Sequence, residues 1–168
     1  MRLRSDADVD ACVRIAEQVH HLDGYPAYLP GGDLRGFLVS NEALGAWITE
    51  LDGDVVGHVA LHLRSSRSVL ELASTSLGLP IESLAVVARL LVAPGARRQG
   101  VGRALLMAAT YEARSRGLWP VLDVATDSTA AIALYEQCGW SRAGDVRVVL
   151  PDGSTLEEAV FLGPGPVI

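Results

Sequence analysis

The chain contains no lysine: its 14 basic residues are all arginine, and 20 aspartates and glutamates outnumber them among 168 residues. A P-loop needs a lysine directly after its second glycine, so this absence excludes the P-loop class of nucleotide-binding proteins. The net charge of -6 argues against non-specific binding to nucleic acid or to an anionic membrane, and it favours encounter with cationic, amine-bearing molecules. We therefore expect neither a nucleic acid nor a membrane among the partners.

Cysteine and long apolar runs are also scarce. Cys12 and Cys138 have no metal-ligand spacing, and two cysteines in a chain of this length do not form a disulfide framework. We expect free thiols and no metal. No charge-free run approaches the roughly 18 residues of a membrane-spanning helix, and Asp6 interrupts the stretch where a signal peptide would be apolar. These features predict a single domain over residues 1–168, located in the cytoplasm.

The most informative stretch is a strand, a glycine-rich turn and a helix in succession. Leu84–Val92 is apolar apart from Arg89, as a buried strand is, and a Pro-Gly pair then interrupts it. After the turn, apolar residues recur at helical spacing, at Val101, Leu105, Leu106, Ala109 and Ala113. Gly100 and Gly102 leave room for a ligand beside the first amides of this helix, which have no intrahelical partner. Such a turn binds anions, above all phosphates.

Two observations narrow the choice of phosphate ligand. The residue three positions after Gly102 is a leucine, so the G-x-G-x-x-G fingerprint of dinucleotide-binding proteins is not present. Arg97-x-x-Gly100-x-Gly102 instead resembles the Arg/Gln-x-x-Gly-x-Gly/Ala turn of the GNAT superfamily of N-acetyltransferases, which holds the pyrophosphate of acetyl-CoA. A plain tight connection between strand and helix is the alternative. The residues that the resemblance assigns to acetyl-CoA binding are Leu91, Val92, Arg97, Arg98, Gln99, Gly100, Val101, Gly102, Arg103, Ala104 and Ser128.

A second segment strengthens the resemblance. Residues 128–140 read Ser-x-x-Ala-Ile-Ala-Leu-Tyr-Glu-x-Cys-Gly-Trp and resemble the family's Asn-x-x-Ala...Leu-Tyr-Glu-x-x-Gly-Phe segment, in the expected order. Ser128 stands where the family usually has asparagine, and Trp140 where it usually has phenylalanine. Tyr135 matches the tyrosine that protonates the departing thiolate in the family. The alternative for Tyr135 is a structural role in which its hydroxyl bonds locally.

The remaining pattern predicts strands alternating with helices. Strands are expected at residues 1–4, 46–51, 55–63, 84–92, 120–125, 147–150 and 157–162, and helices follow residue 6 and cover about 33–39, 101–116 and 129–138, while residues 64–79 are ambiguous. This order implies an α/β fold, with a mixed sheet covered by helices on both faces. The GNAT resemblance implies a central twisted, mostly antiparallel mixed sheet that is splayed in the middle, after the strand ending near Val92.

The loop from Leu22 to Asp33 is too long for a simple connection. It holds Tyr25 and Tyr28 among several prolines and glycines. Long loops in compact domains are usually functional or disordered. Because aromatic rings attract cations, we interpret this loop as part of the acceptor pocket, with both tyrosines binding a cationic amine.

The general base is the least defined member of the site. Many GNAT relatives carry a glutamate on the strand before the glycine turn, whereas residues 85–88 contain no carboxylate. We expect deprotonation through water held by Glu82 or His58, or through the bulk pH that sets the neutral fraction of the amine. His58 shares one face of its strand with His62, and a structural role is the alternative for either histidine. For Arg89, inside an apolar strand, we expect a structural ion pair.

Together these features predict an acetyl-CoA-dependent N-acetyltransferase that acts on a primary amine of a small molecule. A protein amine is an alternative acceptor, and another acyl-CoA is an alternative donor, because the turn recognises CoA rather than the acyl chain. The competing class is a non-catalytic acetyl-CoA-binding or sensor module, which would keep the turn without a usable base. The sequence leaves a homodimer open.

Overall fold

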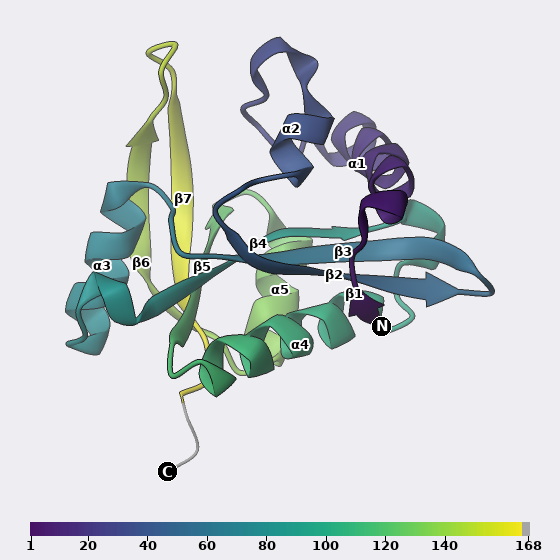
Figure 1. Cartoon of the computed structure of the whole chain (residues 1–168). Helices are drawn as coiled ribbons and strands as arrows, with labels where there is room; N and C mark the ends of the chain where they lie inside the picture. The colour runs from purple at the N-terminus through teal and green to yellow at the C-terminus, as the bar shows by residue number, and fades with distance from the viewer. Residues whose placement is uncertain (166–168) are drawn as a thin grey trace. The chain divides into compact units, whose positions relative to one another are not determined.

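The computed structural model describes residues 1–165, which form two compact units (Figure 1). The first unit comprises residues 1–61 and 88–109, and the second comprises residues 62–87 and those from 110 onward. Strand β4 (Leu84–Val92) and helix α4 (Val101–Ser115) contribute residues to both. The strands are hydrogen-bonded in the order β1-β2-β3-β4-β5-β7-β6. This order confirms the predicted mixed α/β fold.

The first unit combines the strands β1 to β3 and the second part of β4 with the helices α1 and α2, the glycine turn and the first part of α4. Its elements are β1 (Arg2–Leu3), η1 (Asp6–Asp8), α1 (Val9–Asp23), η2 (Pro30–Gly32), α2 (Leu34–Leu38), β2 (Ala43–Leu51), β3 (Asp54–His62) as far as residue 61, the second part of β4, η4 (Pro94–Ala96) and the first part of α4. β1 pairs antiparallel with β2. Asp52 and Gly53, with φ of 52° and 85°, connect β2 to β3 in a two-residue hairpin turn.

Helices cover both faces of the sheet in the first unit. On one face, buried side chains of α1 and α2 pack on Ile48 and Leu91; those side chains are Cys12, Ile15, Ala16, Val19, Leu34 and Leu38. On the other face, α4 approaches β3 at Gly57, where an added β-carbon would lie 2.7 Å from Leu105 and 2.8 Å from Val101. Gly57 therefore interrupts β3 so that α4, the helix after the glycine turn, can pack closely.

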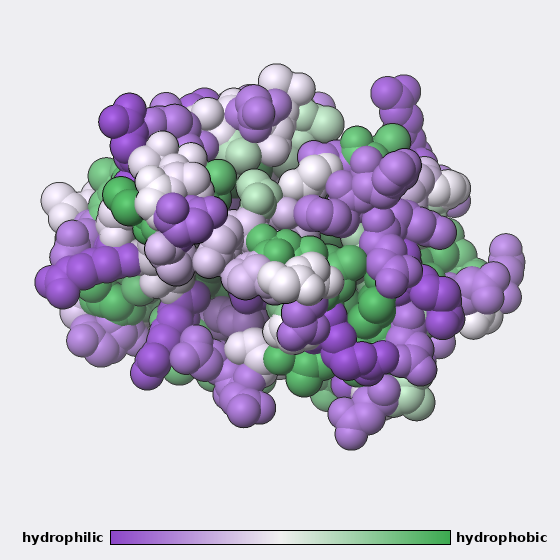
Figure 2. Space-filling view, turned by 90° about the horizontal axis from the view of Figure 1, so that it is seen from above, coloured by the Kyte–Doolittle hydropathy of each residue, from purple (hydrophilic) through white to green (hydrophobic). Residues whose placement is uncertain are grey.

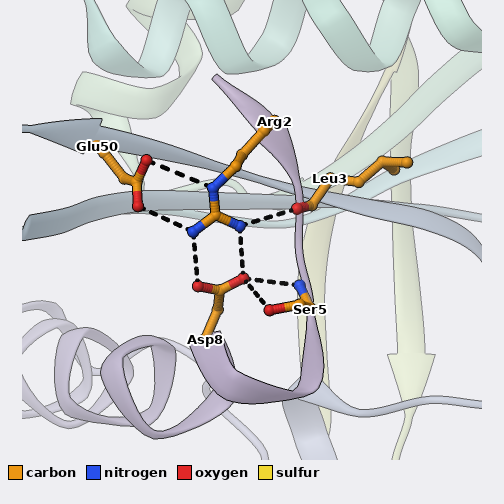
Figure 3. Close-up of polar contacts among 5 residues, drawn as sticks. All are labelled: Arg2, Leu3, Ser5, Asp8 and Glu50. Atoms are coloured by element: carbon orange, nitrogen blue, oxygen red, sulfur yellow. Dashed lines mark hydrogen bonds and ion pairs between the residues drawn. The ribbon is translucent and has the colours of Figure 1, made fainter. Parts of the chain in front are cut away.

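An ion cluster fixes the start of the chain to β2 (Figure 3). The guanidinium of Arg2 donates to both carboxylate oxygens of Asp8, at 2.8 and 2.9 Å, and Nη2 reaches Glu50 at 2.9 Å. Asp8 also accepts from the amide and hydroxyl of Ser5, at 2.7 and 2.8 Å. The hydrogen bonds from Arg2, and then those from Ser5, hold the pKa of Asp8 well below its ordinary value. Arg2 thus joins β1, η1 and β2.

The second unit places one helix on each face of its strands. Its elements are α3 (Arg67–Leu77), η3 (Ile81–Ser83), the first part of β4, the end of α4, β5 (Trp119–Ala125), α5 (Thr129–Gln137), β6 (Ser141–Val149) and β7 (Thr155–Leu162). Apolar residues of α3 pack on Leu84, Val86, Val121 and Val160. On the opposite side of β7, Phe161 contacts Tyr135 of α5. β4 pairs in parallel with β5 over residues 84–86.

Two segments differ from the sequence expectation. The ambiguous residues 64–79 contain the helix α3, which Gly78 ends in a left-handed conformation. β6 begins at Ser141, six residues before the expected start. The sequence did not reveal these residues as a strand, because polar residues alternate along this half-exposed strand, which pairs only with β7. Such a strand lacks the apolar run from which buried strands are predicted.

Within residues 1–165, no helix combines the length and the apolarity needed to cross a membrane. On the face drawn in Figure 2, hydrophobic residues are interspersed among hydrophilic ones.

Candidate active site

The glycine turn connects η4 to α4 within the first unit. The backbone is left-handed at Arg98 and at Gly100, with φ of 62° and 80°. The amide of Ala104 makes the first helical hydrogen bond, to the Gly100 carbonyl at 3.0 Å, so the amides of residues 101–103 have no partner within the helix. A β-carbon added to Gly100 would meet no atom within 4 Å, so the space beside the turn is open. This combination of left-handed backbone and helix N-terminus is suited to binding an anion.

The arginines of the turn differ in their surroundings. Arg97 Nη2 lies 2.5 Å from Asp23 Oδ2 at the end of α1, and Arg97 Nε lies 3.5 Å from the Val92 carbonyl. Arg98 and Arg103 are exposed to solvent. Arg97 therefore joins the turn to the beginning of the predicted acceptor loop, whereas the other two add positive charge at the surface of the turn.

An open pocket of about 480 Å³ lies beside the turn in the first unit. Gly95, Ala96 and Gln99 line it on the turn side, and Asp52 and Asp54 of the β2–β3 hairpin line it opposite. Its size is within the range of small-molecule sites. The glycine turn thus borders a hollow rather than a flat surface.

The strand that leads to the turn is kinked. Arg89 has a φ of 52° in the middle of β4, a left-handed conformation that costs about 1 to 3 kcal/mol for a residue with a side chain. Its Nε donates to the Phe37 carbonyl at 3.1 Å, and its guanidinium lies 4.8 Å from the centre of the Phe37 ring. The ion pair expected for Arg89 is therefore replaced by a carbonyl and an aromatic face. Beyond the kink, Leu91 is buried and Val92 half-buried.

His58 is fully buried in β3, and both of its ring nitrogens are engaged. Nδ1 lies 2.8 Å from the Arg89 carbonyl and Nε2 lies 2.9 Å from Arg4 Nη1. Burial, with a smaller contribution from the positive charges of Arg4 and Arg89, lowers the pKa of His58 to about 4. The ring is therefore neutral at physiological pH.

The other residues expected in acid–base roles lie in the second unit. Glu82 is exposed, in η3. Tyr135 is 8% exposed, and its ring packs 5.8 Å from Phe161 and 6.3 Å from Trp140. Ser128 is half-buried and precedes α5, where its carbonyl accepts from the amide of Ile132.

The predicted acceptor loop is ordered by an aromatic contact. The Tyr25 ring meets Phe37 of α2 edge-on, with centroids 5.8 Å apart, and is 39% exposed. Tyr28 is half-buried. At the end of the loop, the Asp33 carboxylate accepts from the amide of Gly36 at 2.9 Å and thereby caps the helix that follows.

Sequence analysis missed a pair of carboxyl groups in the second unit. Asp123 of β5 and Glu158 of β7 are diagonal neighbours in the antiparallel ladder, and Ser65 donates to Asp123 at 3.1 Å. Burial, and then the neighbouring Asp123 carboxyl group, raises the pKa of Glu158 to about 9, which favours the protonated form of Glu158 at neutral pH. The sequence feature that could have indicated this pair is Asp123 itself, a charged residue inside the otherwise apolar strand 119–125.

Glu158→Gln is expected to stabilise the chain at pH 7 to 8. The folded chain holds a proton on Glu158 that the unfolded chain releases above its ordinary pKa of 4.5. The contribution of this proton to folding stability is therefore fully present below pH 4.5 and is lost as the pH rises through about 9. Glutamine keeps a donor toward Asp123 and does not titrate. Denaturant unfolding at pH 5, 7 and 9 should show a shallower pH slope in the variant.

Uptake of one full proton changes the free energy of unfolding by about 1.4 kcal/mol per pH unit. The slopes of the unaltered chain and of Glu158→Gln should differ by less than this, because Glu158 is partly exposed. Glu157→Gln is the control, since Glu157 is the exposed neighbour on β7 and pairs with Arg147 at 2.6 Å. Equal slopes in the unaltered chain and in Glu158→Gln would contradict the assignment of the proton.

Cys12 and Cys138 are free thiols, as predicted, the first buried and the second half-buried. Within residues 1–165, no group of three or more histidine, cysteine, aspartate or glutamate residues is placed to hold a metal ion.

Comparison with known proteins gives a consistent family and fold. The model of the acetyltransferase (GNAT) family matches residues 14–140. Over 81 residues, the chain is 38% identical to the ribosomal protein bS18-alanine N-acetyltransferase of Escherichia coli strain K12. This match covers 46% of the chain and 53% of the relative, so the chain spans about half the length of the curated relatives it matches.

Solved structures share the fold over almost the whole chain. The ribosomal-protein-S18-alanine N-acetyltransferase from Escherichia coli has a TM-score of 0.66 at 22% identity, covering 96% of this chain and 90% of that one. The yncA protein of Salmonella typhimurium, solved with its cofactor acetyl-CoA, has a TM-score of 0.66 at 19% identity, with the same two coverages. At these identities the likeness concerns the fold alone.

Proposed function

Because the chain belongs to the GNAT family of acetyltransferases, we propose that residues 1–168 act as one domain that transfers the acetyl group of acetyl-CoA to a primary amine. The glycine turn carries the proposal, since its left-handed backbone, its helix N-terminus and the open space at Gly100 fit a pyrophosphate. Acetyl-CoA supplies the activated acetyl group. The cytoplasmic location expected from the sequence belongs to the same proposal.

The chain's own residues take three roles in this reaction. The turn from Arg98 to Ala104 holds the pyrophosphate through those of its amides that have no helical partner, among them residues 101–103. The backbone of Leu91 and Val92 aligns the pantetheine arm and offers an amide to the thioester oxygen. As the amine nitrogen forms the new C–N bond and the C–S bond breaks, Tyr135 gives its hydroxyl proton to the departing sulfur. The proton lost by the amine passes to water.

We assign no strand carboxylate as a dedicated general base. Glu82 is exposed, and His58 has both ring nitrogens engaged by protein groups. The amine then loses its proton to water, which Glu82 can hold in place. The bulk pH sets the fraction of the amine that is neutral. The rate should climb with pH through the pKa of the amine.

Glu82→Gln is accordingly expected to reduce turnover by less than the about 10²- to 10⁴-fold that a directly acting base contributes. A water relay tolerates the loss of one member, whereas a direct base does not. Steady-state rates at saturating amine would measure this. Asp123→Asn serves as the comparison, because Asp123 is a half-buried carboxylate on a strand of the second unit. A loss of 10² or more in either variant, with substrate affinities preserved, would reveal a dedicated base.

The acceptor that we propose is the amine of a small cationic molecule. The net charge of -6 and the aromatic residues of the predicted acceptor loop support it. The second candidate is the amine of an alanine in a ribosomal protein, because curated relatives that match part of the chain carry that activity in their names. The two acceptors differ in size and sequence context, so one assay separates them.

The test is release of CoA thiol from acetyl-CoA against a panel of small amines and peptides beginning with alanine. Peptides with a blocked amino terminus are the matched control, and longer acyl-CoAs test the donor. Amine-dependent thiol release supports the proposal and identifies the acceptor class. Binding of acetyl-CoA without release for any amine would instead indicate a sensor module.

Replacing both Tyr25 and Tyr28 by alanine is expected to raise the KM for the amine about 10-fold. Each ring over a cation contributes about 0.5 to 1 kcal/mol at an exposed site, and 1.4 kcal/mol is a factor of ten. The KM for acetyl-CoA should not change. The double replacement by phenylalanine keeps both rings and should retain the amine KM. The reverse pattern, with only the acetyl-CoA KM affected, would remove this loop from the acceptor pocket.

A further inference from the structure

The protonation of His58 follows from its partners. A carbonyl oxygen only accepts hydrogen bonds and a guanidinium only donates them, so Nδ1 carries the proton toward Arg89 and Nε2 accepts from Arg4. A second ring proton would face the N–H groups of Arg4. The imidazole is therefore fixed in one tautomer and one orientation.

The same two arginines bind the end of helix α2. Arg4 Nη1 also donates to the Leu38 carbonyl at 2.8 Å, and Arg89 Nε donates to the Phe37 carbonyl. The last carbonyls of a helix have no intrahelical partner, so the two guanidiniums complete this helix end. Arg4, Phe37, Leu38, His58 and Arg89 form a closed ring of contacts, which we call the His58 network.

The His58 network reaches both sides of the proposed reaction within the first unit. Arg89 lies directly before Leu90 and Leu91, and its left-handed backbone sets the direction in which the end of β4 continues. On the other side, Phe37 packs edge-on against Tyr25 of the acceptor loop. The network therefore connects the strand that aligns the thioester to the loop that we assign to the amine.

We propose that His58 is a positioning residue for acetyl transfer. Through Nδ1 it holds the kink of β4. Through Nε2 and Arg4 it holds the end of α2, and with it the acceptor loop that packs on α2. The inference rests on the proposed function and assigns His58 a different part from the proton relay considered at the start. A relay needs the Nε2 lone pair, which Arg4 occupies, and access to water, which the burial of His58 prevents.

Three substitutions separate the two contacts of the ring. Asparagine places an amide donor near the position of Nδ1, so His58→Asn keeps the bond to Arg89 and loses the acceptor for Arg4. Glutamine places a carbonyl near the position of Nε2, so His58→Gln keeps the acceptor for Arg4 and loses the bond to Arg89. His58→Phe fills the volume and makes neither bond. Val59→Ala, at a fully buried neighbour on β3, controls for lost stability alone.

The kinetic result expected is a split between parameters. His58→Phe should lower kcat about 10-fold and raise the amine KM about 10-fold, as loss of buried hydrogen bonds predicts. His58→Asn should recover most of kcat but not the amine KM, and His58→Gln should recover the amine KM but not kcat. The pH–rate profile should keep its midpoint in all three. A shifted midpoint, or equal losses in the asparagine and glutamine variants, would overturn the proposal.

Amide hydrogen exchange tests the same coupling without any substrate. His58→Gln should speed exchange at residues 90–93, and His58→Asn should speed it at residues 37–39, each by about 10-fold. Exchange that does not separate the two segments in this way would overturn the coupling even before an acceptor is known. Failure of the proposed function appears differently, as absence of acetyl-CoA binding to the unaltered chain in calorimetry.

Discussion

Replacing Gly102 by valine is expected to weaken CoA binding about 10- to 100-fold while the fold is retained. Gly102 lies in the first turn of α4, where helical backbone accepts a β-carbon, so the isopropyl group crowds the amides of residues 101–103 rather than breaking the helix. Hydrogen bonds to a charged group contribute about 1.5 to 3 kcal/mol each, and 1.4 kcal/mol is tenfold in affinity. Calorimetric titration with CoA measures the loss.

Two further glycine variants separate ligand blocking from backbone strain. Gly100→Val adds a side chain at a φ of 80° in the turn, and Gly153→Val adds one at a φ of 86° in the turn between β6 and β7. Both positions are open and both variants are strained. Only Gly100→Val should lose CoA affinity. Unchanged affinity in Gly102→Val would remove the pyrophosphate from this turn.

Tyr135→Phe is expected to lower turnover about 10²- to 10⁴-fold, the contribution of one general acid, while acetyl-CoA affinity stays within about twofold. Phenylalanine removes only the hydroxyl and keeps the ring that packs on Phe161 and Trp140. The helix α5 and the stability of the second unit should therefore survive. Single-turnover kinetics at saturating amine measure the chemical step directly.

Tyr111→Phe is the matched control for the loss of a tyrosine hydroxyl. Tyr111 lies on α4 and is 74% exposed, so its variant should retain full turnover. Equal turnover in the Tyr135→Phe variant and the unaltered chain would return Tyr135 to a structural role.

The parts of the fold that could be predicted are those with local determinants. β4 runs over the predicted residues 84–92 because its apolar run is bounded by a Pro-Gly pair, and α4 begins at Val101, directly after Gly100. The residues of α3 gave no such signal. Val69 and Ala73 are helical because they pack on strand residues such as Leu84. The serines on either side of them, at positions 65, 66, 68, 74 and 76, are compatible with a loop as well.

In the candidate site, too, the features that depend on neighbouring residues in the sequence could be predicted, and those that depend on distant residues could not. The glycine turn was evident because all of its residues are adjacent in the chain. The contacts of His58 were not, because Arg4 and Arg89 lie 54 and 31 positions away and meet it only through sheet pairing. The pairing of Asp123 with Glu158 likewise depends on the register of β5 and β7. Arg89 was expected to form an ion pair, since sequence alone does not reveal a free carbonyl at the end of α2.

The burial of Cys12 determines how a thiol reagent reports on this protein. Its side chain has no exposed surface, and burial raises the pKa of the thiol to about 11, so it does not react while α1 stays packed. A disulfide dye that detects released CoA therefore meets only Cys138 on the folded chain. Labelling of Cys12 requires α1 to open, and its rate measures the opening equilibrium of the first unit. The dye that measures CoA release thus also measures how often α1 opens, in the same experiment and for every variant.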